Sequence, residues 1–208
     1  MIRAIDRTTQ ITFLLLALAV GLFSLRYLAP EPLLGAPNVL ANRFADMALA
    51  IHAGLGATAL ILGPWQFFRW RDGRRGAGHR VVGVIYVAAC LLSAPAGLLL
   101  AFGATAGPIA GAGFGLLALA WFGTTAMGLR AVLLGEYQAH RRWMIRSFAL
   151  TFAAVTLRLY LFGGPLVGFA GLDAYRAIAF LCWVPNLLAA ELLLRTRPSS
   201  RLPAAAGR

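Results

Sequence analysis

Six long apolar runs constrain the fold of this chain more than any other feature of its sequence. Each is about as long as the roughly 20 residues that an α-helix needs to cross ~30 Å of hydrocarbon. We expect helices over residues 11–29, 44–68, 81–103, 109–134, 136–163 and 174–194, the fifth starting with an interfacial turn before Ser147. The composition, 60% hydrophobic and only 12% charged, is typical of an integral membrane protein. The sequence therefore predicts an all-α membrane fold with six transmembrane helices.

The first run begins after a charged segment, as a cleaved signal peptide would. However, it is long enough to span, Arg26 interrupts its end, and no small-residue cleavage pattern follows. We therefore predict a retained first helix. Residues 1–194 are expected to form one six-helix domain, and the basic tail, residues 195–208, is expected to be disordered.

The basic residues predict the orientation in the membrane. All 19 are arginines, and the net charge is +12. Two precede the first run, five lie in residues 69–80, four in residues 130–146 and four in residues 195–208, whereas only Arg26, Arg43 and Arg176 lie at the opposite ends. Positive charge stays on the cytoplasmic side, so both termini of this inner-membrane protein are expected in the cytoplasm. The expected partner is a surface of anionic headgroups rather than nucleic acid, because the arginines occupy short loops between spans. A homo-oligomer is left open.

The second to fifth helices are expected to form a four-helix core, with a His-Arg pair before the second and fourth of them. His79-Arg80 and His140-Arg141 would lie at the cytoplasmic end, which suggests two related hairpins. Two neutral imidazoles can ligate one haem. Gly83, one turn after His79, would leave room for the flat ring, while Arg80 and Arg141 could pair with propionates. The alternative is that both histidines are solvated among headgroups.

A second polar group is expected in the outer half of the membrane. His52 lies roughly 12 Å deep at 1.5 Å per residue, near Asp46 on its own helix and Arg158 on the fifth helix. Ionisable groups in a membrane mark functional sites. Asp46 and Arg158 could form a buried ion pair bordering a small cavity, with His52, Thr156 and Tyr160 within reach. The alternative is that Arg158 extends along its aliphatic stem to the outer surface.

The remaining polar residues predict structure rather than chemistry. Cys90 and Cys182 lie inside apolar runs without metal-ligand spacing, so we expect small buried side chains and no metal site. Asn186 and Glu191 on the last helix are expected to make hydrogen bonds between helices. We assign no catalytic residue, and whether the chain is an enzyme stays open.

Several motifs together resemble a known family. They are His52 with Gly63 and Gln66, His79-Arg80-x-x-Gly83-x-x-Tyr86, His140-x-x-Trp143-Met144-x-Arg146, and then Arg158, Asn186 and Glu191. Over residues 45–194 the chain resembles a family of bacterial predicted membrane proteins catalogued as a domain of unknown function. The resemblance implies a membrane location and no assigned reaction.

The chain is more distantly similar to the two-haem cytochrome b carriers, including the cytochrome b561-like ferrireductases. Their four-helix core holds one haem between its second and fourth helices, which is where His79 and His140 lie. His52 has no histidine partner on the third core helix, where Met127 is near the wrong end, so this likeness allows at most one bis-histidine haem. It implies a haem- or cofactor-binding membrane redox protein. The alternatives are a non-catalytic partner-binding or assembly protein, and a small-solute or proton pathway through Asp46, His52 and Arg158.

Overall fold

A computed structural model describes residues 7–29, 37–66 and 76–196. Six helical segments in these ranges are long and apolar enough to cross a membrane. They are Thr8–Leu28, Ala45–Gln66, Ala77–Phe102, Pro108–Leu133, Tyr137–Val167 and Gly171–Arg195. The prediction of six spans is confirmed. No strand occurs in the described residues.

Three of the six spans combine an α-helix with a short turn of another helical type. In chain order the first elements are α1 (Arg7–Ser24), η1 (Leu25–Leu28), the single turn α2 (Pro37–Leu40), the π-helical η2 (Ala45–Leu49), α3 (Ala50–Leu62) and η3 (Gly63–Gln66). They are followed by α4 (Ala77–Phe102), α5 (Pro108–Leu133), α6 (Tyr137–Thr151), α7 (Ala153–Gly163), η4 (Gly164–Val167), α8 (Gly171–Leu181) and α9 (Val184–Arg195).

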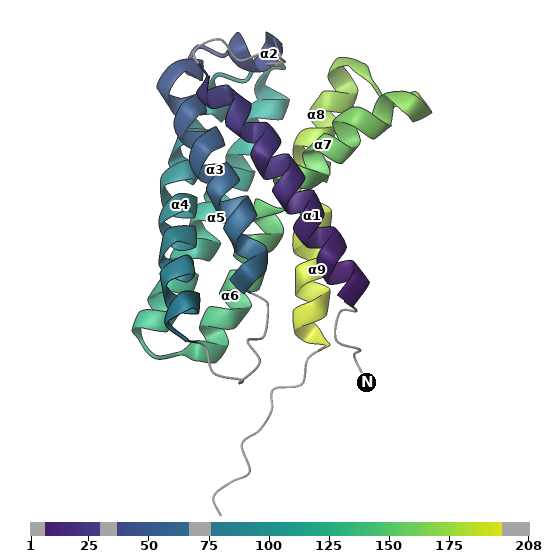
Figure 1. Cartoon of the computed structure of the whole chain (residues 1–208). Helices are drawn as coiled ribbons and strands as arrows, with labels where there is room; N and C mark the ends of the chain where they lie inside the picture. The colour runs from purple at the N-terminus through teal and green to yellow at the C-terminus, as the bar shows by residue number, and fades with distance from the viewer. Residues whose placement is uncertain (1–6, 30–36, 67–75, 197–208) are drawn as a thin grey trace, which may run out of the picture.

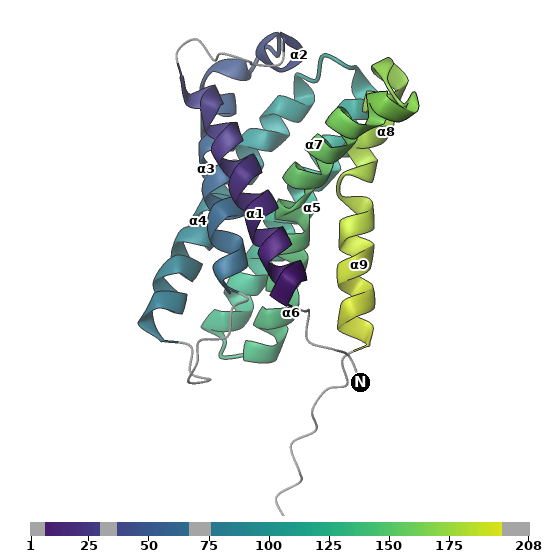
Figure 2. The same cartoon turned by 45° about the vertical axis from the view of Figure 1, so that its right-hand side comes forward.

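Helices α3 to α6 form a bundle that the other helices flank (Figure 1). Helix α1 crosses the bundle diagonally, and α7 and α8 lean away from it before α9 returns along its side (Figure 2). We call the end that carries α2 the upper end. At the opposite, lower end α1, α4 and α6 begin and α9 finishes.

The largest core lies at the centre of this bundle, and each of its four helices contributes to it. Ala59 of α3, Tyr86 of α4, Trp121 of α5 and Leu150 of α6 are all almost completely buried. Small side chains of α4, including Cys90, leave room for the two aromatic rings. The predicted four-helix core is thus confirmed. Cys90 and Cys182 are buried free thiols, as predicted.

Glycines allow α5 to approach its neighbours closely. A Cβ on Gly111 would lie 2.7 Å from the carbonyl oxygen of Ala101 on α4, and one on Gly113 would lie 2.8 Å from the Cβ of Ala179 on α8. Without side chains at these positions, α5 packs backbone to backbone on two sides. Gly107 turns the chain into α5 with a φ of 90°, which favours glycine, and Pro108 follows as its first residue.

The last two spans are interrupted, although each was predicted as one continuous helix. The α-helical pattern breaks at Phe152 between α6 and α7, and at Cys182 and Trp183 between α8 and α9. Pro185 explains the second break, because proline has no N–H for the carbonyl one turn earlier and its ring clashes there. At the first break, the Thr151 hydroxyl donates to the Ser147 carbonyl of its own helix at 2.9 Å, a contact that often bends helices. Pro95, in contrast, lies within an uninterrupted α4.

Candidate functional site

At the lower end, α6 presents His140 with a fixed ring orientation. His140 lies in the first turn of α6 and is half-buried. Its Nδ1 is 2.8 Å from the carbonyl oxygen of Gly128 on α5. A carbonyl only accepts, so Nδ1 carries the proton and donates it, which leaves the lone pair on Nε2. This is the tautomer in which histidine can ligate a metal.

The other three residues predicted to act with His140 lie at the same end. His79 is half-buried in the first turn of α4, and Arg80 next to it is exposed. Arg141 is exposed in the first turn of α6. Because α4 and α6 both begin at the lower end (Figure 1), the structure brings both His-Arg pairs to one end of the bundle.

The space that the sequence assigned to a flat ring beside Gly83 holds a side chain. A Cβ on Gly83 would lie 3.3 Å from Oε1 of Gln66, which comes from η3. Gln66 therefore covers the glycine. The adjoining α5–α6 contact is also tight, because a Cβ on Gly128 would lie 2.6 Å from Sδ of Met144.

The structure does not pair Asp46 with Arg158. Asp46 is exposed in η2, and Arg158 donates from Nη1 to the carbonyl of Ala154 at 2.9 Å and from Nη2 to Oγ of Ser24 at 2.8 Å. Among the described residues, ion pairs join Arg146 to Glu191 and Arg176 to Asp173. The side-chain partner of Arg158 is thus Ser24 of α1, whereas Asp46 lies exposed in η2.

His52 makes no hydrogen bond to Arg158, and its ring faces α4 and α5. Its Nδ1 lies 3.1 Å from the carbonyl oxygen of Ser93, and the Ser93 hydroxyl donates to the carbonyl of His52 at 3.1 Å. The ring packs against Gly97, where a Cβ would lie 2.8 Å from it, and meets the ring of Trp121 edge-on at 6.4 Å. Thr156 instead bonds to Asn186 at 3.2 Å. The predicted outer cluster is therefore dispersed over several helix contacts.

Tyr160, the last member of that predicted cluster, is half-buried on α7. None of the hydrogen bonds found among the described residues uses its hydroxyl. It contributes no polar link to His52 or Arg158.

A buried group of hydroxyls at the centre of the bundle was missed from the sequence. Tyr86 of α4, Trp121 and Thr125 of α5, and Ser147 and Thr151 of α6 are each at most 6% exposed. We call these five side chains the hydroxyl ring. The signal that could have revealed it is the four-residue spacing on each helix, from Trp121 to Thr125 and from Ser147 to Thr151, which places each pair on one helix face.

Every side chain of the hydroxyl ring has a hydrogen-bond partner. The Thr151 proton goes to the carbonyl of Ser147, so Thr151 accepts from Nε1 of Trp121 at 2.9 Å and from the Tyr86 hydroxyl at 2.9 Å. Ser147 donates to Tyr86 at 3.0 Å, and Thr125 donates to Ser147 or to the carbonyl of Trp121, each at 2.8 Å. The chain starts at an indole, which cannot accept, and ends on a carbonyl, which cannot donate. It has no open end for a ligand or a travelling proton, so its role is to lock three helices together.

Two further polar contacts attach α9 to the rest of the molecule. Arg146 of α6 binds the Glu191 carboxylate through both Nε and Nη2, and its guanidinium lies 4.7 Å from the ring centroid of Trp143. Asn186 donates to Oγ1 of Thr156 on α7 at 2.9 Å. These are contacts between helices, as predicted for Asn186 and Glu191.

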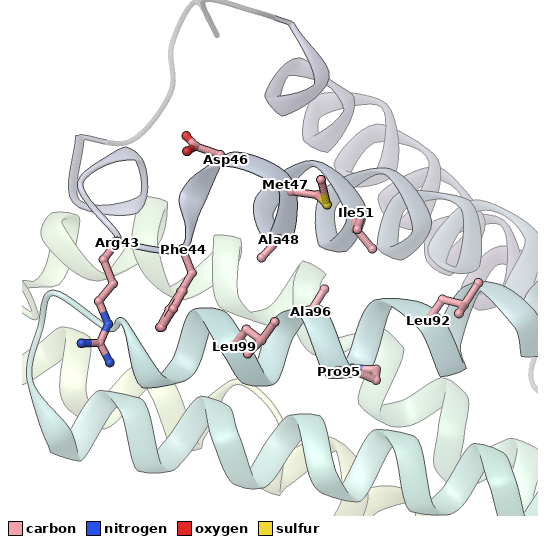
Figure 3. Close-up of a pocket in the computed structure, with 10 residues that line it drawn as sticks. All are labelled: Arg43, Phe44, Asp46, Met47, Ala48, Ile51, Leu92, Pro95, Ala96 and Leu99. Atoms are coloured by element: carbon pink, nitrogen blue, oxygen red, sulfur yellow. The ribbon is translucent and has the colours of Figure 1, made fainter.

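An apolar groove of about 440 Å³ runs along the outside of the contact between η2, α3 and α4 (Figure 3). Its lining residues are Arg43, Phe44, Asp46, Met47, Ala48, Ile51, Leu92, Pro95, Ala96 and Leu99. Asp46 points away from α4 and Arg43 extends beyond the apolar side chains, so neither charge projects into the groove. The groove therefore offers shape and apolar surface but no chemical group that selects a ligand.

The candidate cofactor ligands are therefore His140 and His79, which both lie at the lower end. No group of three or more His, Cys, Asp or Glu side chains in the described residues could hold a metal ion. A protein-family model described as "Predicted membrane protein (DUF2306)" matches residues 49–194, which include all three histidines and the hydroxyl ring. No curated protein and no solved structure matches the chain.

Proposed function

The chain belongs to the DUF2306 family of predicted membrane proteins, and we propose that it is a cofactor-binding membrane redox protein whose lower end holds a haem through His140 and His79. The observation that carries the proposal is the hydrogen bond from Nδ1 of His140 to the Gly128 carbonyl. We place the protein in a bacterial inner membrane with this end towards the cytoplasm.

The anchored ring of His140 supports this role. Histidines that ligate metals almost always donate their other ring N–H to a carbonyl, carboxylate or water, which fixes the tautomer and the ring orientation. His140 and His79, at the start of α4, would hold the haem iron. Arg80 and Arg141 are exposed at the same end, where guanidiniums suit the propionates. A haem held by two imidazoles would supply electron transfer.

Accommodation of a ring requires one local change. Nε2 of His140 is suited to bind the haem iron, but Gln66 covers Gly83, where the flat ring was expected to lie. Gln66 has an unbranched side chain at the end of η3, and rotation about its side-chain bonds would uncover the glycine. In this proposal Gln66 moves aside when the group binds, and Gln66→Ala should increase haem occupancy rather than abolish it.

The test is an absorbance spectrum of the full-length protein, purified after expression with ample haem supply. We expect a sharp alpha band on reduction. His140→Gln and His79→Gln should each abolish the band, while His52→Gln, the matched control in the upper half of the bundle, should leave it intact. Protein that stays colourless although it melts cooperatively would overturn the proposal. If the band is lost in His52→Gln but kept in the other two variants, the haem is bound at His52 and not at the lower end.

A second candidate is a non-catalytic membrane protein that binds or assembles a partner. The hydroxyl ring favours it, because a fully satisfied buried network gives a rigid and unique packing without needing a ligand. This candidate predicts a colourless protein whose three histidines can all be replaced by glutamine with little loss of function in the cell. A pathway through Asp46, His52 and Arg158 gains no support, since these residues face different neighbours.

A further inference from the structure

Two arginines of the upper half lie near each other between α1 and α7, and neither is paired with an acidic residue in the described part of the chain. Arg158 of α7 donates to Ser24 at the end of α1, and Arg26 follows two residues later in η1. Arg26 lies close enough to Arg158 to act on it electrostatically. The two positive charges are therefore neighbours inside a membrane protein, where a charge is costly.

Neutral groups hold both guanidiniums in place. Ser24 donates its own proton to the carbonyl of Val20 at 2.7 Å, so its oxygen is free to accept from Arg158. The guanidinium carbon of Arg26 lies 3.7 Å from the ring centroid of Phe23, and Nη2 donates to the Tyr27 hydroxyl at 3.0 Å. Nε of Arg26 is buried and has no acceptor among the described residues. These contacts position the arginines but do not cancel their charge.

The described acidic residues cannot supply the missing charge. They are Asp46, Glu136, Asp173 and Glu191. Asp173 and Glu191 are paired with Arg176 and Arg146, and neither Asp46 nor Glu136 lies within ion-pair distance of a described arginine. Within the described residues, two neighbouring positive charges with a donor left over therefore form a site that a bound anion would complete.

We propose that Arg26 and Arg158 form a binding site for a phosphate group, with an anionic phospholipid of the leaflet at the upper end as its main source. Arginine suits phosphate because its planar donors match two oxygens at once. Arg26 lies two residues before the end of the first span, Thr8–Leu28, close to the level of lipid headgroups. Leu25 and Leu28 beside it, and Phe162 of α7, expose apolar side chains to which acyl chains can pack. The rings of Phe23 and Phe162, 6.4 Å apart, close the contact between the two helices.

The site would join α1 to the part of the chain that matches the family. Ser24 and Arg26 lie before residue 49, and Arg158 lies within the matched range. A bound phosphate would therefore tie α1 to α7 and increase thermal stability. This inference is independent of haem binding, since the two sites lie at opposite ends of the bundle.

The experiment is thermal melting of the full-length protein in neutral detergent, titrated with phosphatidylglycerol, phosphatidylcholine or inorganic phosphate. Phosphatidylglycerol should raise the melting temperature more than phosphatidylcholine does. Arg26→Gln should increase the concentration needed for half of this effect about tenfold, since a lost hydrogen bond to a charged group costs about 1.5 kcal/mol or more. Arg43→Gln is the matched control, because Arg43 is an exposed arginine at the same end that also stacks on a ring, that of Phe44.

The outcomes separate the possible sources of the phosphate. If inorganic phosphate stabilises the wild type but not Arg26→Gln, and phosphatidylglycerol has no effect, the site binds free phosphate. If phosphatidylglycerol acts equally on wild type, Arg26→Gln and Arg43→Gln, the lipid acts through general surface charge and the proposal is wrong. It is equally wrong if neither ligand shifts the melting temperature of the wild type. Arg26→Gln alters a half-buried side chain in a short helix, so it should fold, and its melting in phosphatidylcholine verifies this.

Discussion

At the scale of single residues, the buried hydroxyls decide more of this structure than the histidines do. Tyr86 takes part in two hydrogen bonds that no other side chain can replace, because its ring carries the hydroxyl from α4 across to Ser147 and Thr151 of α6. Ser147 and Thr151 lie only one turn apart on a single helix. One side chain therefore connects two helices that are not consecutive in the chain.

Tyr86→Phe should destabilise the protein by about 1–2 kcal/mol. The substitution removes only the hydroxyl, and hydrogen bonds between membrane helices contribute about 0.6 kcal/mol on average and up to about 1.7 kcal/mol. The free energy of unfolding in mixed micelles measures the effect. Tyr160→Phe is the matched control and should change this free energy by less than about 0.5 kcal/mol. Equal effects of the two substitutions would show that the hydroxyl ring is not stabilising.

The residue scale is also where the sequence was least informative. Depth along a helix placed Asp46, His52 and Arg158 in one half of the membrane, but depth does not specify the direction in which a side chain projects. Arg158 turned towards Ser24, and His52 towards Ser93. Likewise, Gly83 does leave space next to His79, yet the sequence could not show that Gln66 fills it.

At the scale of helices, the sequence predicted more, because the length of an apolar run is a one-dimensional property that the membrane thickness fixes. All six spans were found this way. The break at Phe152 was missed because it depends on local hydrogen bonding, whereas Pro185 in the sequence could have indicated the break at Trp183. The close packing of α5 at Gly111 and Gly113 needed the structure, because a glycine in the sequence does not identify the neighbouring helix.

Gly113→Ala should weaken the contact between α5 and α8 by about 1–3 kcal/mol, the usual cost of overpacking. The new Cβ would lie 2.8 Å from the Cβ and 2.9 Å from the carbonyl oxygen of Ala179, and the backbone cannot give way easily. Gly123→Ala on the same helix is the control. Nothing lies within 4 Å of a Cβ there, so the better helix propensity of alanine should leave stability unchanged or raise it by up to about 1 kcal/mol. Unfolding of both variants in detergent compares them, and a stabilised Gly113→Ala would contradict the packing seen here.

At the scale of the whole molecule, the arrangement of helices gives the arginine distribution a spatial meaning. Arg80, Arg130, Arg141 and Arg142 are all exposed at or near the lower end, where α4 and α6 begin and α5 finishes. At the upper end, Arg176 is paired with Asp173, Arg26 stacks on Phe23 and Arg43 on Phe44. Among the described residues, exposed arginines are therefore more numerous at the lower end than at the upper end, which is the pattern that orients membrane proteins.

The lower end should face the cytoplasm. Reporter fusions after Arg142, at the start of α6, should give a cytoplasmic signal, and fusions after Gly171, at the start of α8, should give an external one. The same experiment at Arg75 and Arg201 should report the cytoplasm and at Gly35 the outside, although these three positions lie outside the described residues. Replacing Arg141 and Arg142 together with glutamine should weaken the preference without inverting it, because the other arginines of this end remain.

Two outcomes would contradict this topology. A cytoplasmic signal at Gly35 with an external signal at Gly171 would mean that the first helix does not span the membrane. A cytoplasmic signal at Gly171 with an external signal at Arg142 would mean that the whole bundle is inverted. In the inverted case the proposed haem would lie on the outer side of the membrane, and the phosphate site would face lipids of the cytoplasmic leaflet.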